Sequence, residues 1–469
     1  MINEEQFTGN EDKMLTMKLS EISIVCGGRL IGDGSIDITN ITTDSRTAKR
    51  NGLFAALVGE RTDGHKYIKT ALDNGAAAVI CEKQPSEQNI NYILVGSTLK
   101  ALQDIAAYML KKSGIPSVEI GGSVGKTSTK EAVASVLEQK YSVLKTEGNY
   151  NNDLGVPLTI FNIKKDNNAA VIETGIDDFG QMELLSSIVR PYICILTNIG
   201  DCHLENLGDR AGVLRAKSEM FNNIRPDGHI ILNGDDEYLS PLKDINGKHP
   251  IFFGLDPKND IFADNIKNEG LKGSSCDIHT SKGIFNAVVP KPGEHMILNA
   301  LAATGAGLIM GLSLEEIKKG IEGQQSISGR FNIINKNGIK IIDDCYNANP
   351  MSMKASLESL SHAQGRTVAV IGDMGELGEN EIKLHEEVGI TAAKFNINLI
   401  CCIGKLSAYM ARAAESNGKS EVLHFETVDE FNKQAHKLIK KEDTVLVKAS
   451  HFMKFDSIVS ALTETVLDN

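Results

Sequence analysis

Tryptophan is absent from the 469-residue chain, and aromatic residues make up only 5% of it. No apolar run approaches the roughly 20 residues that a membrane-spanning helix needs. The first residues lack the basic-then-apolar pattern of a secretory signal, and the polar stretch 1–16 predicts a loose tail. We therefore expect no membrane insertion and a cytoplasmic location.

The eight cysteines lack the spacing that a metal site or a redox motif would need. No two of them form a C-x-x-C pair, and Cys401 and Cys402 lie in an apolar run that predicts a buried strand. Free thiols in a core are typical of a reducing compartment. The chain also has no G-x-S-x-G segment and no Cys/His pair at a recognisable spacing, so covalent nucleophilic catalysis is not indicated.

Basic residues are too few and too scattered for a nucleic-acid surface. The formal net charge is -12, and no block of Lys and Arg stands out. An acidic chain that binds a nucleotide must gather its positive groups at one place. Hydrophobic residues at 41% and charged residues at 23% suit a globular protein, and the length suggests two to four domains.

Apolar runs and turns predict an α/β protein with three domains. Short runs separated by turns indicate a small α/β domain over 17–100. Strand-then-helix units over 101–326 predict a doubly wound parallel sheet, with buried β-branched strands at 169–172, 193–197 and 230–232 and a local β excursion over 252–289. A third, Rossmann-like α/β domain is expected over 327–469, with strands at 339–342, 367–371, 399–403 and 444–447.

A glycine-rich turn carries the strongest chemical signal. The segment GGSVGKT (121–127) follows a β-rich run and precedes a predicted helix over 128–138. Such glycines let backbone N–H groups close around phosphate oxygens, and the helix N-terminus adds partial positive charge. Lys126 can reach the β- and γ-phosphates, and the Thr127 hydroxyl can bind Mg²⁺. Ile120 replaces the first glycine of the strict Walker pattern, so an ordinary strand-to-helix turn is the alternative.

Two other polar segments follow predicted strands and should reach the same edge of the sheet. Glu173 ends the strand at 169–172 and could hold Mg²⁺, which prefers one or two carboxylates with phosphate oxygens and water. His203 stands in TNIGDCHLE (197–205) and could ligate a second metal or contact the γ-phosphate. A solvated strand-end glutamate and a structural histidine are the alternatives.

Local pattern says less about Lys217 and Asp344. Lys217 lies in RAKSE (215–219) on a predicted helix, where Lys–Glu pairs usually form a solvated face. Asp344 lies in IIDDCYNANP (341–350), where two acids end a β-run before a helix. It could hold a ribose hydroxyl or a metal, and an Asp N-cap is the alternative.

Together these residues resemble the Mur ligase family, over almost the whole chain beyond residue 17. The segments that carry the resemblance are TDSR (43–46), LFAAL (53–57), GERTDGH (59–65), TEGNYNNDLGVPL (146–158), DDCYNANP (343–350) and IGDMGELG (371–378) followed by His385. The first three are similar to the family's N-terminal uridine-nucleotide domain. Within the family, the likeness is to the branch that joins D-alanyl-D-alanine to UDP-N-acetylmuramoyl-tripeptide.

The resemblance implies an ATP-dependent amide-bond ligase of cytoplasmic peptidoglycan precursor synthesis. The tripeptide's terminal carboxylate would attack the γ-phosphate of ATP, and the dipeptide amine would displace phosphate from the acyl phosphate. A free carboxylate and an amine form only a salt, so this activation is needed. Charge on the transferring phosphoryl group would be held by Lys126, loop N–H groups and Mg²⁺. A monomer with small-molecule substrates and no nucleic-acid partner is implied.

The resemblance also implies roles for individual residues. Catalytic roles fall on Lys126, His203 and Lys217. Metal ligation falls on Thr127, Glu173, His203 and Lys217, the last as a carbamate that supports the second of two Mg²⁺ ions. ATP binding falls on Gly122, Ser123, Gly125, Lys126, Thr127, Ser128, Asn299 for adenine, and Arg330 and Asp344 for the γ-phosphate and ribose. Substrate binding falls on Ser45 and Arg46 for the uridine diphosphate, and on Asn149, Asn151, Asn152, Tyr346, Asn347 and Asn349.

Such an ATP site would be split between the second and third domains. Closure of the third domain would assemble it and keep water from the acyl phosphate, so open and closed states are expected.

Several positions depart from the family pattern: Thr174, Asp177, Gln181, Met296, Ala449 and His451. The last two stand in KASH (448–451), where KGSR is typical, near the expected place of the incoming dipeptide. Alanine lacks glycine's backbone freedom, and histidine lacks arginine's permanent bidentate charge. A family ligase with another acceptor or nucleotide sugar therefore stays open. A P-loop switch and a scaffold are the alternatives from other classes, although neither needs the third-domain segments around 330 and 344.

Overall fold

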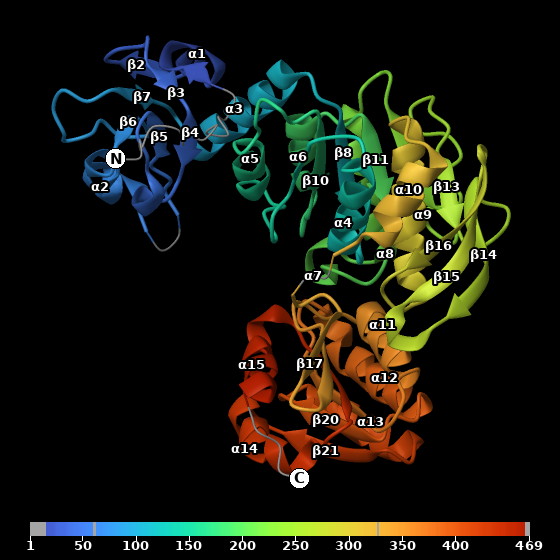
Figure 1. Cartoon of the computed structure of the whole chain (residues 1–469). Helices are drawn as coiled ribbons and strands as arrows, with labels where there is room; N and C mark the ends of the chain where they lie inside the picture. Colours follow the sequence, from blue (N-terminus) through green and yellow to red (C-terminus); the bar gives the residue numbers. More distant parts are fainter. Residues whose placement is uncertain (1–15, 60–61, 326–327, 465–469) are drawn as a thin grey trace, which may run out of the picture.

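The computed structural model describes residues 16–59, 62–325 and 328–464, which form three α/β parts in chain order (Figure 1). Of the predicted tail, only residue 16 lies within the described residues. Glu60 and Arg61, in the segment at 59–65, also lie outside them. Within the described ranges, no helix has both the length and the apolar character needed to cross a bilayer.

The first part is built on a five-stranded sheet in the order β2-β7-β6-β5-β4. Its strands are β2 (Arg29–Ile31), β4 (Asn40–Thr42), β5 (Gly52–Ala55), β6 (Ala76–Cys81) and β7 (Tyr92–Leu94). The last four are parallel, and β2 is antiparallel to β7. Two helices, α1 (Leu19–Val25) and α2 (Ile68–Asp73), accompany the sheet.

Helix α3 (Thr98–Ser113) leads from the first part to the second. The Tyr108 hydroxyl on α3 donates a hydrogen bond to Glu21 on α1 (2.7 Å). Buried residues of α3 join a cluster that includes side chains from both parts. The helix therefore packs against both, as its position in Figure 1 also shows.

The second part contains a nine-stranded sheet in the order β16-β15-β14-β13-β12-β11-β8-β10-β9. Its parallel strands are β8 (Ser117–Gly121), β9 (Val143–Lys145), β10 (Ala169–Glu173), β11 (Ile193–Leu196), β12 (His229–Asn233), β13 (Ile251–Gly254) and β14 (Ile261–Asn268). Strands β15 (Ser274–Thr280) and β16 (Gly283–Val289) are antiparallel. The predicted excursion over 252–289 is thus the continuation of this sheet, which is mixed rather than wholly parallel.

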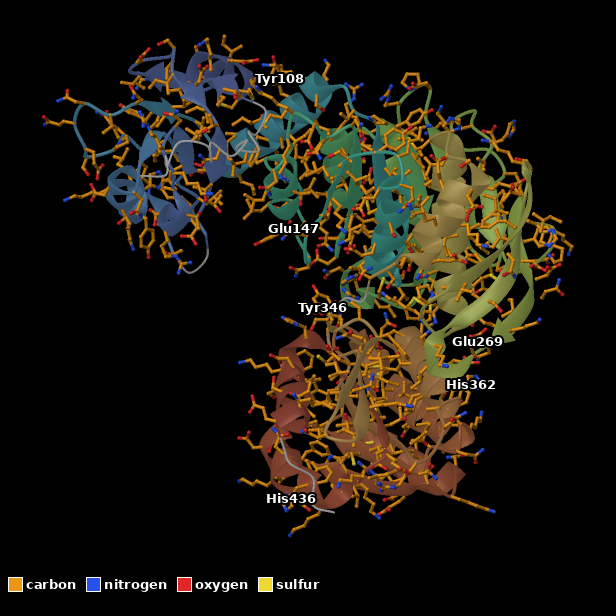
Figure 2. The ribbon with its side chains drawn as sticks, viewed as in Figure 1. Tyr108, Glu147, Glu269, Tyr346, His362 and His436 are labelled. Atoms are coloured by element: carbon orange, nitrogen blue, oxygen red, sulfur yellow. The ribbon has the colours of Figure 1, made fainter. Side chains whose placement is uncertain are left out.

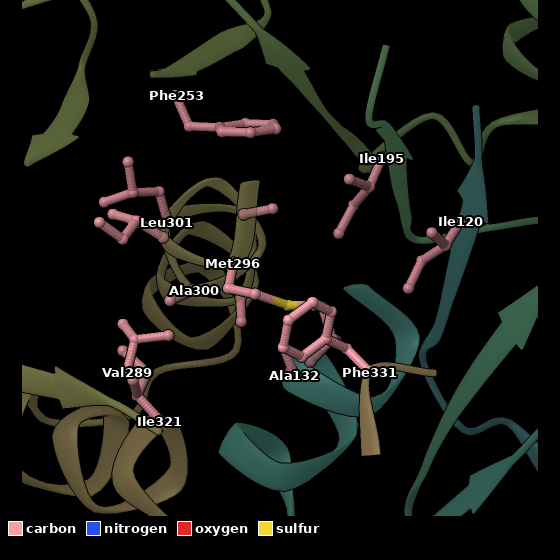
Figure 3. Packing of buried hydrophobic residues seen from close by; sticks show 14 of the residues in the cluster. Ile120, Ala132, Ile195, Phe253, Val289, Met296, Ala300, Leu301, Ile321 and Phe331 are labelled. Carbon is pink, nitrogen blue, oxygen red and sulfur yellow. The ribbon is translucent and has the colours of Figure 1, made fainter. Parts of the chain in front are cut away.

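Helices cover both faces of the central strands, which explains why those strands are apolar on both sides. Ile120 and Ile195 point into one cluster with α4 (Lys126–Leu137), α9 (Glu294–Ile309) and α10 (Leu314–Glu322), part of which Figure 3 shows. Cys194 and Leu196 point into another, which involves α5 (Gly155–Ile160), α6 (Gln181–Val189) and α8 (Arg210–Ser218). The predicted doubly wound arrangement is confirmed.

The third part has a six-stranded sheet in the order β17-β18-β22-β19-β20-β21. The strands are β17 (Asn332–Lys336), β18 (Ile339–Asp343), β19 (Thr367–Gly372), β20 (Leu399–Ile403), β21 (Glu421–Phe425) and β22 (Thr444–Lys448). All are parallel except β17. The helices are α11 (Pro350–Ser361), α12 (Glu381–Lys394), α13 (Ser407–Asn417), α14 (Val428–Leu438) and α15 (Asp456–Glu464).

The third part packs directly on the second. Phe331, at its start, is buried in the cluster around α9, and its ring lies beside Met296 (Figure 3). Glu269 and His362 mark a second meeting place, where the segment after β14 approaches the end of α11 (Figure 2). The site described next lies at this junction.

Candidate active site

Strand register brings the predicted site segments to one edge of the central sheet. Glu173 at the end of β10 aligns with Ile120 on β8, and Leu196 at the end of β11 aligns with Gly121. A cavity of about 710 Å³ opens at this edge, between the second and third parts. The predicted residues that line it are Ser123, Gly125, Lys126, Thr127, Ser128, Asn149, Asn151, Asn152, Glu173, His203, Asn299, Arg330, Asp344, Tyr346, Asn347 and Asn349.

The phosphate loop depends on glycine for its shape. Gly122 has φ +141°, and a Cβ there would stand 2.0 Å from the Thr197 hydroxyl oxygen. Gly125 has φ +80° and caps the N-terminus of α4. These positions let the chain turn from β8 into α4 while touching the end of β11.

The second half of the loop presents backbone N–H groups that can bind an anion. The Ser123 and Val124 N–H groups donate to the carbonyl and side-chain oxygens of Asn198 (both 3.0 Å). The N–H groups of Lys126, Thr127 and Ser128 are the first three of α4 and have no intrahelical acceptor. The helix start is therefore the anion-binding end of the loop.

Two further side chains equip this end of the cavity. The Lys126 ammonium donates to the Gly122 carbonyl (3.0 Å) and lines the cavity, and its other N–H donors could meet a phosphate. Asn299 on α9 accepts from the Thr129 hydroxyl (2.9 Å), which fixes its amide at the cavity wall. His295 also lines the cavity, and burial lowers its pKa to about 4, so its imidazole is neutral at pH 7.

Glu173 has the properties of a metal ligand. Its side chain is buried, and Oε1 accepts from the Asn151 amide (2.9 Å). Oε2 has no hydrogen-bond partner among the described residues. A buried carboxylate oxygen without a partner is costly, and a hard cation would satisfy it. The described residues contain no group of three or more His, Cys, Asp or Glu placed to hold a metal, so a cation here would also need the Thr127 hydroxyl, phosphate oxygens or water.

His203 contacts the third part directly. It precedes α7 (Leu204–Leu207) with φ +52°, an uncommon conformation for a residue other than glycine. Its Nδ1 lies 2.8 Å from the Oε2 atom of Glu376, and the histidine holds the pKa of that carboxyl below its usual value. The sequence did not indicate this partner.

Lys217 is buried, so the interpretation that it lies on a solvated helix face is wrong. The side chain is 1% exposed, and no hydrogen bond or ion pair links it to any other residue that the structure describes. Burial lowers its pKa to about 8, with a smaller opposing effect from Cys202 and a contribution from the charge of Lys126. Lys217 is not among the residues that line the cavity.

The third part contributes a charged and aromatic wall. The Arg330 guanidinium carbon lies 3.9 Å from the centre of the Tyr346 ring, a cation–π contact. Tyr346 stands on the side of the third part that faces the second, across from the segment around Glu147 (Figure 2). Burial raises the pKa of Tyr346, the charge of Arg330 opposes this, and the charge of Glu173 adds to it. The two parts therefore interact across the cavity.

Asp344 is held by a buried ion pair and not as a helix cap. Its carboxylate lies 2.7 Å from the Lys448 ammonium and accepts from the Phe331 N–H and the Ser356 hydroxyl. The N-cap of α11 is Asn349, which forms a capping box with Ser352. The N-cap interpretation of Asp344 is wrong because the N-cap lies five residues later.

The other predicted substrate residues differ in what they do. Asn151 holds Glu173, Asn152 accepts from the Gly155 N–H (2.8 Å), and the Asn347 carbonyl accepts from Lys448 (3.0 Å). Ser45 and Arg46 lie in the first part and do not line the cavity. Arg46 is exposed and paired with Asp44 (2.7 Å).

Ala449 and His451 occupy different environments. Ala449 is fully buried, and a Cβ added at the neighbouring Gly372 would stand 2.8 Å from its methyl carbon. His451 is exposed, with its ring centre 5.6 Å from that of Tyr346. Of the two departures, His451 is the exposed one, and it lies beside Tyr346, which lines the cavity.

Comparison with known proteins agrees with this geometry. Three family descriptions match consecutive regions: the Mur ligase family catalytic domain over 37–118, the Mur ligase middle domain over 120–307, and the Mur ligase glutamate ligase domain over 329–451. A relative from Bacillus subtilis, UDP-N-acetylmuramoyl-tripeptide–D-alanyl-D-alanine ligase, is 35% identical over 92% of this chain and 94% of its own. The chain belongs to the Mur ligase family.

Other Mur ligases extend the comparison to structure. The Escherichia coli protein of the same name is 32% identical over 96% of this chain and 99% of its own. A crystal structure of MurF from Acinetobacter baumannii superposes with a TM-score of 0.90 at 32% identity, covering 96% of this chain and all of that one. MurF from Thermotoga maritima in complex with ADP gives 0.79 at 27% identity, covering 91% and 97%. The three-part architecture is therefore that of Mur ligases.

Proposed function

We propose that this chain is the ATP-dependent ligase that adds D-alanyl-D-alanine to UDP-N-acetylmuramoyl-tripeptide in peptidoglycan precursor synthesis. The observation that carries the proposal is the shared cavity, in which a phosphate loop from the second part faces Arg330 and Tyr346 from the third. Relatives that match nearly the full chain are named as ligases of these two substrates, which supports the proposed substrates. A nucleotide switch would not need the second wall.

The reaction would proceed by activation of the tripeptide's terminal carboxylate. Lys126 and the first N–H groups of α4 would bind the ATP phosphates, and Arg330 would neutralise charge on the γ-phosphate as the carboxylate oxygen bonds to phosphorus and ADP leaves. The dipeptide amine would then attack the carbonyl carbon of the acyl phosphate and expel phosphate. The walls of the cavity supply position and charge rather than acid–base groups.

Magnesium would be held by Glu173 and Thr127, with His203 and Lys217 supporting a second ion. The unpartnered Oε2 of Glu173 is the observation that fits. When bound, the ions would neutralise phosphate charge. Lys217 would serve as a carbamate, because a lysine with a lowered pKa is more often the neutral amine that adds CO₂, and a carbamate offers the oxygens that Mg²⁺ prefers.

The three parts would divide the substrates among them. We assign the uridine nucleotide to the first domain (17–100) with Ser45 and Arg46, ATP to the second (101–326), and the dipeptide to the third (327–469). Asn299 would contact adenine and Asp344 the ribose. Binding would close the third domain further on the second, in a cytoplasmic monomer.

A related ligase with another acceptor is the second candidate. Lys448 is 3% exposed and already paired with Asp344, which leaves it unsuited to hold a dipeptide carboxylate. That task would fall to His451, which is exposed beside Tyr346.

Phosphate release tests the proposal. Purified protein is given ATP and UDP-N-acetylmuramoyl-tripeptide, with and without D-alanyl-D-alanine, beside Lys126→Met. We expect release that depends on the dipeptide and is lost in the variant. Release without the dipeptide would contradict the proposed acceptor, and release that persists in Lys126→Met would contradict the proposed ATP site.

A further inference from the structure

His203 and Glu376, two non-glycine residues with positive φ, connect the second and third parts beside the cavity. Both His203 and Glu376 line it, and their side chains meet at 2.8 Å between Nδ1 and Oε2. His203 belongs to the loop after β11, whereas Glu376 belongs to the loop after β19. The contact therefore exists only when the third part lies against the second.

The backbone at both residues is held in an unfavourable conformation. His203 has φ +52° and Glu376 has φ +62°, values at which a side chain crowds the following carbonyl. Neither residue is glycine. Such a conformation persists where surrounding contacts impose it, often at functional sites. The two loops are thus shaped to bring these side chains together.

The pairing decides which imidazole nitrogen carries the proton. A carboxylate oxygen only accepts, so Nδ1 must be the donor, and in the neutral ring Nε2 then keeps its lone pair. A histidine that acts on a metal or phosphate is commonly oriented in this way by a carboxylate on its other nitrogen. Here the carboxylate comes from a different domain.

We propose that Glu376 is a positioning residue that acts through His203 and makes docking of the third part a condition for phosphoryl transfer. While the parts are docked, Glu376 fixes the ring with Nδ1 protonated and Nε2 free. When they separate, His203 loses this orientation and the reaction stops, which limits wasteful ATP hydrolysis. The proposal rests on the proposed ligase function.

The chain offers a matched control for Glu376. Glu379 lies three residues further on, in the short helix η5 (Gly378–Asn380), and it is exposed. Its side chain makes no hydrogen bond or ion pair with any residue in the described part of the chain. Glu376→Ala and Glu379→Ala therefore remove the same charge from the same loop, but only the first breaks the contact with His203.

The test compares these variants in the full chain by kinetics and by nitrogen NMR. For Glu376→Ala we expect kcat to fall about 10- to 100-fold. The KM for ATP should stay within about 2-fold of its original value, because the phosphate loop is intact. Spectra of ¹⁵N-histidine protein at pH 8.5, with His203→Asn to assign the signal, should show a protonated Nδ1 in the original chain that Glu376→Ala loses. Glu379→Ala should change neither measurement.

Two outcomes would overturn the proposal: kinetics of Glu376→Ala that match those of Glu379→Ala, or a His203 ring with the proton on Nε2 in the original chain. If the unmodified protein forms no product, the ligase function fails instead, and the spectra still decide whether the pairing sets the tautomer.

Discussion

Replacing Glu119 with glutamine should remove a pH-dependent loss in the free energy of unfolding. Glu119 lies on β8, two residues before the phosphate loop, and its side chain is 0% exposed. Neither carboxyl oxygen has a hydrogen-bond partner among the described residues. Burial raises its pKa from 4.5 to about 8, an effect that the nearby Thr174 hydroxyl partly offsets.

The sign and size of the effect follow from these two pKa values. Between pH 4.5 and 8 the folded protein holds a proton on Glu119 that the unfolded chain releases, so the free energy of unfolding falls as pH rises. The stabilisation that is lost by pH 7 is about 3 kcal/mol, against less than about 1 kcal/mol at pH 5. Glutamine has a similar shape and cannot ionise, so Glu119→Gln should lack this dependence.

Urea denaturation followed by circular dichroism, repeated at pH 5, 6, 7 and 8, measures the difference between the two proteins. A difference in unfolding free energy that is the same at every pH would reflect the amide itself and does not bear on the prediction. The difference in unfolding free energy should change by 2–3 kcal/mol between pH 5 and 7, an order-of-magnitude figure. Parallel pH profiles for the two proteins would refute the reasoning, since the carboxyl would then ionise in the core at no cost.

Three other changes test separate features. Gly122→Ala should abolish ATP binding in calorimetry, because a Cβ would stand 2.0 Å from the Thr197 hydroxyl oxygen. The control is Gly114→Ala: Gly114 has φ +69° but open space around it, so this variant should bind ATP normally. Lys448→Met should lower the free energy of unfolding by about 3–5 kcal/mol, because it leaves Asp344 buried and unpaired, and an unchanged urea midpoint would contradict this. Lys217 has a folded pKa of about 8 against 10.5 unfolded, so in CO₂-free buffer stability should rise by about 3 kcal/mol as pH rises from 8 to 10.5. Lys217→Met should show no such rise, and equal profiles would argue against the buried cation.

Continuous apolar runs predicted the strands that are buried on both faces, whereas a strand with exposed residues could be missed. The run at 399–403 is apolar throughout and matches β20, whereas its neighbour β21 (Glu421–Phe425) has two exposed residues and gave no signal. The segment of the antiparallel strands β15 and β16 predicted a local β excursion within the central domain, because pattern reveals a strand but not its partner. Pairing depends on contacts between distant segments.

The same limit applies to the site. Residues at strand ends, such as Glu173, could be placed because parallel register brings such ends to one edge. The surroundings of Lys217 and Asp344 could not be predicted from local pattern, because they depend on distant segments. Lys217 is enclosed by packing, and Asp344 meets Lys448 over a hundred residues later. The pairing of His203 with Glu376 joins two domains and leaves no trace in local sequence.

The most direct test of the central claim follows one oxygen atom. UDP-N-acetylmuramoyl-tripeptide with ¹⁸O in its terminal carboxylate is incubated with ATP, D-alanyl-D-alanine and the protein, and the products are analysed by mass spectrometry. We expect a product enlarged by the dipeptide and inorganic phosphate that carries one ¹⁸O atom, because a carboxylate oxygen bonds to the γ-phosphorus before the amine expels phosphate. Unlabelled phosphate, or no enlarged product, would contradict the account.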